Sequence, residues 1–291
     1  MLYYYILNEH RDVADLRSQG GTCKANVLQF PLKRSIKMTF VGIDIGSTAA
    51  KTVVVGEKNL KFVLPTGWSG KKTAEEIKKR LLCEGIDVND ENVKIAATGY
   101  GRKAVYYADY TATEITCHGI GAGKIFGKNC TVIDVGGQDT KVISVLNGKV
   151  TDFVMNDKCA AGTGKFVEIM ANRLGVEIDE LFDLAQKGGN LKISSLCTVF
   201  AETEVINYIG EGHEQQDIAF AVADSVASKV ALMCRNKIYS DKIVLTGGLS
   251  EIKYFAKILG EKIGTEVSPL EHGRFAGAVG AAMVAKKKSG M

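Results

Sequence analysis

The sequence is poor in proline and tryptophan, with three prolines and one tryptophan in 291 residues. No apolar run approaches the length that crosses a lipid bilayer, which excludes a membrane-spanning helix. Nothing resembles a secretory signal, so we expect a cytoplasmic protein without a membrane partner. With proline rare, the 32 glycines are the main turn formers, which argues against a linker-rich array of modules.

An excess of charge of one sign is also missing. The 37 lysines and arginines nearly balance 33 acidic residues, the formal net charge is +4, and the lysines are scattered. This charge is too small to argue for nucleic-acid binding, and we expect no nucleic-acid partner. An apolar share of 46% and a charged share of 24% are typical of globular proteins, and the length suffices for two ordinary domains.

The seven cysteines form no Cys-x-x-Cys pair, so their spacing alone predicts no metal site. A cytosolic chain keeps its thiols reduced, which leaves core thiols, metal ligands and reactive groups as interpretations. Core packing is the simplest interpretation for five of them. These five are Cys23, Cys83, Cys117, Cys130 and Cys234.

The most informative segment runs from Asp134 to Lys141 and reads Asp-Val-Gly-Gly-Gln-Asp-Thr-Lys, between two apolar runs that predict strands. Adjacent glycines let backbone N–H groups approach a phosphate, because glycine has no Cβ in the way. An acid at the end of the first strand can hold Mg²⁺ through water. One such turn would be weak evidence, since most glycine turns are ordinary hairpins.

The segment from Phe40 to Val55 repeats this pattern, with a strand, Asp-Ile-Gly-Ser-Thr, a lysine and a second strand. Asp44, Gly46 and Lys51 correspond at one constant offset to the residues Asp134, Gly136 and Lys141. Internal repetition at a long period indicates two similar α/β halves, each presenting a phosphate-binding hairpin to one cleft. A third glycine turn, Gly247-Gly248, also follows an apolar strand.

The three turns resemble those of the actin, sugar-kinase and chaperone ATPase superfamily. The resemblance implies a duplicated ribonuclease-H-like α/β fold. Its two domains, residues 38–125 with 270–288 and residues 126–269, are expected to enclose a nucleotide. In that superfamily two hairpins clamp the phosphates, and the third turn lies beside the nucleoside.

Each residue of the candidate nucleotide site has an expected role. Asp44 and Asp134 face Mg²⁺ through water, and Lys51 either neutralises a phosphate or points to solvent. Phosphate oxygens are held by Ser47, Thr48 and the backbone of Gly46, Gly136 and Gly137. Gly247 and Gly248 lie beside the nucleoside of ATP or ADP.

The identity of residue 138, a glutamine, helps to distinguish ATP hydrolysis from phosphoryl transfer to a sugar. Sugar kinases need an acid that takes a proton from the substrate hydroxyl. A glutamine cannot do this, but it can orient a water molecule. We therefore expect Gln138 to act in ATP hydrolysis rather than in transfer of a phosphoryl group to a sugar.

Periodicity and capping residues also predict individual elements. We expect helices from Thr73 to Leu82, from Glu114 to Lys124, from Gln215 to Cys234 and from Gly273 to Ala285. The small residues of the last helix suit close packing, and we expect it to return to the first half. Residues 1–37 fit no part of the repeat and are expected to be poorly ordered or an artefact of the chosen start codon. The alternative is a short strand or helix docked on the body.

Cys159 and Cys197 form a second candidate site. Each stands among small or polar residues, immediately before a predicted helix. Helix N-termini offer free N–H groups and a positive dipole, which stabilise a thiolate or an anionic cluster. Two thiolates cannot complete a four-cysteine iron–sulfur site, but a two-fold dimer supplies four. Adjacent Cys117 and His118 point different ways on a helix, so we interpret them as packing or a domain-connecting contact.

From Met38 onward the chain resembles the ATP-dependent activators, called component A, of 2-hydroxyacyl-CoA dehydratases. Benzoyl-CoA reductase subunits belong to the same wider group. The segments that carry the resemblance are Gly42–Ala49, Ala97–Arg102, Glu114–His118, Val132–Lys141, Met155–Gly164 and Cys197–Glu202. The segment from Met155 to Gly164, which reads MNDKCAAGTG, is highly specific.

The resemblance implies a homodimer that shares one [4Fe-4S] cluster, with Cys159 and Cys197 of each protomer as ligands. A ferredoxin or flavodoxin is the expected electron donor, and the dehydratase is the acceptor. ATP binding and hydrolysis drive the transfer of one electron. The sequence names neither the acyl-CoA substrate of the partner nor the particular donor.

Three alternatives stay open. The first is an ATPase subunit of a benzoyl-CoA-type reductase, or an activator of another double-cluster reductase. The second is a sugar or acetate-type kinase, against which Gln138, Cys159 and Cys197 argue. The third is a nucleotide-sensing module that binds ADP and never hydrolyses ATP.

Overall fold

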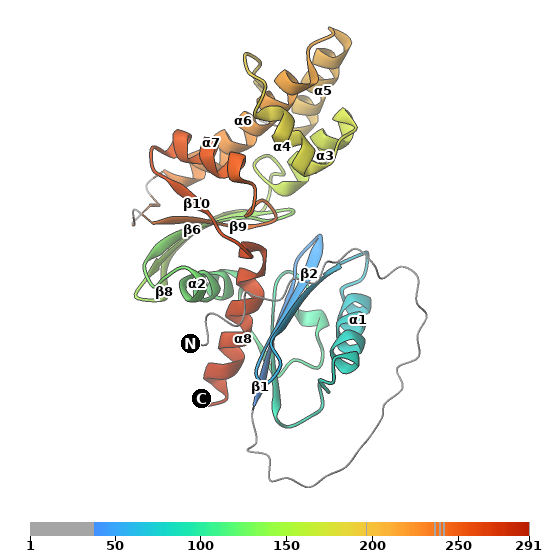
Figure 1. Ribbon diagram of the computed structural model, residues 1–291, viewed down its shortest axis with the longest axis vertical. Coiled ribbons are helices and arrows are strands. Elements are labelled where there is room, and N and C mark those ends of the chain that lie inside the picture. Colours follow the sequence, from blue (N-terminus) through green and yellow to red (C-terminus); the bar gives the residue numbers. More distant parts are fainter. Residues whose placement is uncertain (1–37, 196, 236, 239, 241, 291) are drawn as a thin grey trace.

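The computed structural model describes residues 38–195, 197–235, 237–238, 240 and 242–290. The segment of residues 1–37, for which the sequence gives an expectation, lies outside this described part. The described chain forms two five-stranded sheets with helices between and around them (Figure 1). No helix in the described part is long and apolar enough to cross a membrane.

The first sheet has the strand order β3-β2-β1-β4-β5. Its strands are β1 (Thr39–Ile45), β2 (Ala49–Val55), β3 (Leu60–Pro65), β4 (Val93–Thr98) and β5 (Tyr110–Thr111). The first three form an antiparallel meander, and β4 and β5 continue the sheet in parallel with β1. Helix α1 (Gly70–Cys83) buries Ile77 and Leu81 in one apolar cluster with Ile43 of the sheet.

Helix α1 begins earlier than the sequence analysis expects. Ser69, not Thr73, is its N-cap, and the Ser69 side chain accepts a hydrogen bond from the Lys72 N–H. The hydroxyl of Thr73 instead donates to the carbonyl of Thr66, so Thr73 is used inside the helix to hold the preceding loop.

The second sheet repeats the first, with the strand order β10-β9-β6-β7-β8 and the same pattern of antiparallel and parallel neighbours. Its strands are β6 (Cys130–Val135), β7 (Thr140–Leu146), β8 (Lys149–Asn156), β9 (Ile243–Gly247) and β10 (Val267–Pro269). The repeat extends to single residue pairs, because Asp44 lies opposite Lys51 and Asp134 lies opposite Lys141. The duplicated α/β fold predicted from these residues is confirmed.

Five helices cover the second sheet or extend from it. They are α3 (Gly164–Leu174), α4 (Ile178–Ala185), α5 (Thr198–Gly210), α6 (Gln215–Cys234) and α7 (Lys253–Ile263). Helix α6 has the predicted bounds, and its buried face joins one large apolar core with α3, α4, α7 and the sheet. The apolar pattern of the sequence therefore predicts this long helix correctly, because the same apolar residues form its buried face.

Helices α2 (Glu114–Ile125) and α8 (Ala276–Lys288) pack against each other between the two sheets (Figure 1). Helix α2 lies on β6, β7 and β8, whereas α8 lies on β1, β2 and β4, as expected for a helix that returns to the first half. A short 3₁₀ turn, η2 (Gly273–Phe275), precedes α8, so the helix begins three residues later than predicted. A second 3₁₀ turn, η1 (Arg102–Ala104), follows β4.

Glycines make this helix pair possible. A Cβ on Gly121 would lie 1.8 Å from the Ala276 carbonyl oxygen, and one on Gly280 would lie 1.8 Å from the Cys117 carbonyl oxygen. On the other side, a Cβ on Gly42 would lie 1.9 Å from the Ala278 carbonyl oxygen. These contacts are between backbones, which cannot yield as a flexible side chain does. The two sheets can therefore lie this close together only because these three positions are glycine.

We predict that Gly121→Ala lowers the free energy of unfolding by about 1–3 kcal/mol or more, because its methyl group forces α2 and α8 apart. Gly123→Ala is the matched control on the same helix, where the nearest atom to the new Cβ is 3.8 Å away. It should be neutral or stabilising by up to about 1 kcal/mol, through helix propensity alone. Urea unfolding measures both, and equal stability of the two variants would contradict the close helix contact.

Candidate nucleotide site and exposed cysteines

The two repeated hairpin turns face each other. A Cβ on Gly137 would lie 2.3 Å from the Thr48 hydroxyl oxygen and 3.0 Å from the Ser47 hydroxyl oxygen. Each turn is closed by a backbone hydrogen bond, from Gly46 N–H to the Ala49 carbonyl at 3.1 Å and from Gly136 N–H to the Asp139 carbonyl at 2.9 Å. The structure thus brings the candidate phosphate-binding residues of both halves into one place.

The third predicted turn lies beside the second hairpin. Gly247 has φ +87°, and a Cβ there would lie 2.3 Å from the Val135 carbonyl oxygen, so only glycine fits. The neighbouring Gly248 N–H donates to the same carbonyl at 2.9 Å.

A fourth turn matches the third. Gly99 has φ +90°, and its Cβ would lie 2.3 Å from the Ile45 carbonyl oxygen. The Gly101 N–H donates to that carbonyl at 2.8 Å. The equivalence of this turn with Gly247 was missed in the sequence, although a Thr-Gly pair after an apolar strand, at Thr98 and at Thr246, was the available signal.

The two repeated aspartates are buried inside strands β1 and β6, with Asp44 3% and Asp134 2% exposed. The Thr246 hydroxyl donates to Asp134 Oδ1 at 2.8 Å, and Lys141 Nζ lies 3.5 Å from Asp134 Oδ2. Burial alone would raise the pKa of Asp134, but the nearby His118 and Lys141 outweigh it and hold that pKa well below its ordinary value. Lys51 Nζ lies 3.9 Å from Asp44 Oδ2, so Lys51 points into the site rather than away from it.

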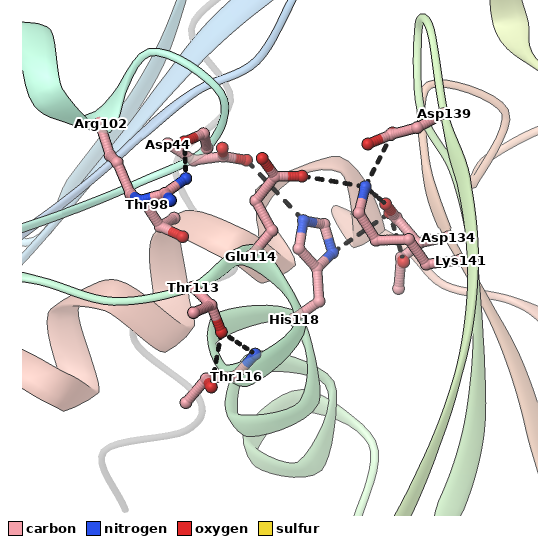
Figure 2. Close-up of polar contacts among 12 residues, drawn as sticks. Asp44, Thr98, Arg102, Thr113, Glu114, Thr116, His118, Asp134, Asp139 and Lys141 are labelled. Carbon is pink, nitrogen blue, oxygen red and sulfur yellow. Dashed lines mark hydrogen bonds and ion pairs between the residues drawn. The ribbon is translucent and has the colours of Figure 1, made fainter. Parts of the chain in front are cut away.

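Lys141 is buried and held by three carboxylates. Its Nζ lies 2.7 Å from Asp139 Oδ1 and 3.0 Å from Glu114 Oε2, in addition to the contact with Asp134. Burial works against the charged amine, but these acids outweigh it and raise the pKa of Lys141 above its ordinary value. Glu114 stands on α2, so this lysine of the second sheet is tied to the central helix (Figure 2).

His118, also on α2, stands between the two aspartates, as Figure 2 shows. Its Nδ1 lies 3.2 Å from Asp134 Oδ1, and its Nε2 lies 3.9 Å from Asp44 Oδ2. Burial would lower the pKa of His118, but the two carboxylates, Asp134 first, raise it above its ordinary value. The sequence predicts only a packing or domain-connecting contact for this residue, because helix periodicity does not reveal what a helix lies against.

A pocket of about 460 Å³ opens beside the first hairpin turn. Ser47, Trp68, Tyr100, Lys103 and Gln138 are among its lining residues. None of its lining residues is an aspartate or a glutamate. The pocket next to the phosphate turns therefore offers an amide at Gln138 but no carboxylate that could remove a proton from a hydroxyl.

Cys159 and Cys197 are exposed and lie outside this pocket. Cys197 is the N-cap residue of α5, as expected. Cys159 is not immediately before its helix, because Thr163 is the N-cap of α3 and Ala160, Ala161 and Gly162 intervene. The prediction of a cysteine immediately before a helix is therefore confirmed for Cys197 and wrong for Cys159.

The loop of Cys159 is tied to the second hairpin turn. The Gly164 N–H donates to the Gly136 carbonyl and the Lys165 N–H to the Gly137 carbonyl, both at 2.8 Å. The Asn156 side chain accepts from the Cys159 N–H at 3.2 Å and donates to the Cys159 carbonyl at 2.8 Å. The first turn of α3 thus connects a thiol-bearing loop to the candidate phosphate turn.

The segment before Cys197 is held differently. Ser194 and Ser195 donate to the Glu204 carboxylate through backbone and side chain. Beyond Cys197, Val199 and Phe200 are each 65% exposed. Adjacent exposed apolar side chains of this size are typical of a surface that another chain covers.

Of the remaining cysteines that the structure describes, three are buried and one is exposed. Cys117, Cys130 and Cys234 are buried, as predicted, and burial raises their pKa values to about 11, 11 and 12. Cys83 is exposed, so its prediction as a core thiol is wrong. It is the last residue of α1 and does not belong to the buried face of that helix. Cys23 lies outside the described residues.

The repeated sheets, the facing glycine turns and the paired buried aspartates define a two-sheet protein of the actin-like ATPase and sugar-kinase fold. A ROK family glucokinase from Streptomyces griseus has this fold, with a TM-score of 0.52, 15% identity, and coverage of 86% of this chain and 99% of that chain. The model of the BadF/BadG/BcrA/BcrD ATPase family matches residues 41–285, and the chain belongs to this family.

Relatives within the family are much more similar. The (R)-2-hydroxyglutaryl-CoA dehydratase activating ATPase of Acidaminococcus fermentans is 39% identical, over 86% of this chain and 97% of its own length. One of the benzoyl-CoA reductase subunits of Thauera aromatica is 32% identical, over 83% and 91%. The solved activator of the 2-hydroxyisocaproyl-CoA dehydratase from Clostridium difficile, with bound ADPNP, has a TM-score of 0.80 at 34% identity, with coverage of 87% and 96%.

We predict that native protein freed of any bound iron reacts with iodoacetamide at pH 8 at Cys83, Cys159 and Cys197, which are exposed. Only a thiolate attacks, and a pKa of about 11 or above keeps Cys117, Cys130 and Cys234 protonated across pH 7–9 as well as shielded. Peptide mass spectrometry measures the labelling, with urea-unfolded protein as the control in which all sites react. Rapid native labelling of the three buried thiols would contradict their placement.

Proposed function

We propose that this protein is an ATP-hydrolysing activator of a 2-hydroxyacyl-CoA dehydratase, which transfers one electron to its partner. The observation that carries the proposal is the meeting of the two hairpin turns at Gly137, Ser47 and Thr48, above two buried aspartates. The activities of the similar relatives supply the partner class. In this proposal the protein is an ATPase of the cytoplasm.

The nucleotide lies between the proposed domains, residues 38–125 with 270–288 and residues 126–269. Backbone N–H groups and hydroxyls of Gly46, Ser47, Thr48, Gly136 and Gly137 bind phosphate oxygens. The turn at Gly247 and Gly248 lies beside the nucleoside. This donor set suits phosphate because it is composed of N–H and O–H groups that approach without steric hindrance.

Magnesium fits the pair of aspartates as a water-mediated ion. Mg²⁺ keeps most of its waters and needs one or two carboxylates, which Asp44 and Asp134 provide. When bound, the ion neutralises charge that develops on the phosphates. Lys51 points into the same space and balances part of the phosphate charge.

Gln138 orients the attacking water. Its amide lines the pocket next to the phosphate turn, and the absence of a carboxylate among the lining residues supports hydrolysis rather than transfer to a hydroxyl. This observation also disfavours the sugar-kinase alternative, which requires a base at that position.

Cys159 and Cys197 fit a [4Fe-4S] cluster shared by two copies of the chain. Both thiols are exposed, Cys159 in the loop before α3 and Cys197 at the N-cap of α5, and these two helices pack together. The described residues contain no group of three or more histidine, cysteine or acidic side chains placed to hold a metal, so a four-thiolate site needs two chains. The exposed Val199 and Phe200 beside Cys197 support a homodimer at this face. A bound cluster would supply the one-electron redox centre, with a ferredoxin or flavodoxin as donor.

Benzoyl-CoA-type reduction is the second candidate, favoured by the similarity to the benzoyl-CoA reductase of Thauera aromatica. A dedicated activator is a separable homodimer, whereas a component of a reductase co-purifies in a hetero-oligomer. Mass determination after anaerobic purification from the native source distinguishes the two.

We predict that Gln138→Ala lowers kcat for ATP hydrolysis about a hundredfold, because the attacking water loses its orienting group. The dissociation constant for ADP should change less than about twofold. Gln186→Ala, at the exposed end of α4, is the matched control and should keep the parent rate. Unchanged turnover in Gln138→Ala would remove this residue from the mechanism.

We predict that Cys159→Ser and Cys197→Ser, each purified without oxygen, retain less than about a tenth of the iron of the parent dimer. Cys83→Ser, another exposed cysteine, should keep the full iron content. Iron counting and the absorbance band of the cluster are the measurements. Full iron in either of the first two variants would contradict the ligand assignment while leaving the ATPase proposal standing.

A further inference from the structure

His118 occupies a place in the site that the roles given above do not use. It belongs to α2, which packs on the second sheet and against α8, which in turn packs on the first sheet. Its ring reaches a carboxylate of each sheet, Asp134 at 3.2 Å from Nδ1 and Asp44 at 3.9 Å from Nε2 (Figure 2). One side chain therefore spans the boundary between the two repeated halves at their paired aspartates.

The His118 ring is buried, but well-aligned hydrogen bonds do not fix its position. His118 is 6% exposed, and its Nδ1 has no aligned hydrogen-bond partner within the described part of the chain, although Asp134 is close. At 3.2 Å the contact between Nδ1 and Asp134 is close but poorly aligned, so the position of the ring can change without loss of a well-formed hydrogen bond. A buried polar atom left without an aligned partner is uncommon in proteins and indicates a functional constraint.

Gly277 on α8 leaves the space for this arrangement. A Cβ there would lie 2.6 Å from Asp44 Oδ2 and 2.9 Å from His118 Nε2, and its three nearest atoms all belong to these two residues. Unlike Gly121 and Gly280, this glycine is needed by the aspartate and histidine side chains and not by a helix backbone. Both helices between the sheets thus contribute to the position of the ring.

We propose that His118 is a positioning residue of the nucleotide site, which sets the separation of Asp44 and Asp134 and so prepares them for Mg²⁺-nucleotide. Two buried carboxylates repel each other unless a donor or cation stands between them. The imidazole does this in the arrangement seen here. The contact to Asp44 is the longer of the two, so it would give way more easily to a hydrated Mg²⁺ ion. The inference rests on the proposed nucleotide site, and it concerns the metal-dependent part of binding.

The test compares ADP binding with Mg²⁺ and with EDTA by calorimetry. In His118→Ala the dissociation constant for ADP with Mg²⁺ should rise about tenfold, and the half-saturating Mg²⁺ concentration for ATP hydrolysis should rise similarly. The constant measured in EDTA should change less than about twofold, because the phosphate turns are intact. A merely structural role would weaken binding equally in both conditions, and that result overturns the proposal.

Three further variants sharpen the test. His118→Asn retains a donor near the Nδ1 position, towards Asp134, and His118→Gln retains one near the Nε2 position, towards Asp44. Neither spans both carboxylates, so each should remain at least about threefold weaker than the parent with Mg²⁺. Gly277→Ala keeps the histidine but intrudes on its contact with Asp44, and it should reproduce the Mg²⁺-dependent loss.

The matched control is His213→Ala, which removes an exposed histidine that pairs with Glu211 at 3.2 Å and should change nothing. If His118→Ala does not fold, the asparagine and Gly277→Ala variants decide, and parent-like Mg²⁺ dependence in both overturns the proposal. A parent protein that binds no ADP under either condition would instead refute the proposed function, which keeps the two failures distinct.

Discussion

The approach of Gly137 to the hydroxyls of Ser47 and Thr48 is the constraint on which the site depends. Two turns that meet this closely require two sheets held at a fixed separation, and that separation comes from the backbone contacts of α2 with α8 and of α8 with β1. Gly121, Gly280 and Gly42 make those contacts possible. The glycines of β1, α2 and α8 therefore set the separation of the sheets, and the glycine of the second turn allows the two turns to meet at that separation.

Charge imposes the second constraint. A buried carboxylate is costly unless it is paired, and breaking one pair leaves the other group uncompensated. Asp134 is satisfied by Thr246, Lys141 and His118, and Lys141 is satisfied by Asp139 and Glu114 in turn. Among the described residues, the cationic contacts of Asp44 are the longer ones, to Lys51 and His118 at 3.9 Å each. The two halves of the repeat are therefore alike in backbone and unlike in charge environment, and the first is the more open to a new ligand.

The sequence predicts the duplicated fold well because the repeated aspartate, glycine and lysine have the same offsets and turn out to occupy the same register. It predicts α6 from end to end because a long apolar face leaves little freedom. It fails at the start of α1, where Ser69 and Thr73 are both suitable capping residues, because the Thr73 hydroxyl bonds the Thr66 carbonyl instead of capping the helix. It also fails for Cys83, because Cys83 comes two residues after the buried Leu81 and so faces the opposite side of the helix.

Residues that act across the repeat were the hardest to foresee. The role of His118 depends on which sheet α2 lies against, and nothing in the local pattern of that helix encodes this. The family resemblance, which the matching family model confirms, was carried by contiguous motifs, and a contiguous motif says little about contacts between distant segments. The equivalence of the turns at Gly99 and Gly247 became clear only from the structure, where each turn follows a strand that runs parallel to the first strand of its sheet, β4 beside β1 and β9 beside β6.

The hydrogen bonds of the second hairpin turn also indicate which of the two exposed cysteines would move together with that turn. The carbonyls of Gly136 and Gly137 accept from the first two N–H groups of α3, and the loop carrying Cys159 runs directly into that helix. The segment before Cys197 is held instead by Glu204 within α5. A displacement of the second hairpin turn would therefore reach Cys159 before Cys197. In the proposed dimer this makes the two thiols of one chain respond unequally to the nucleotide, since one follows the phosphate turn and the other follows the helix that faces the partner.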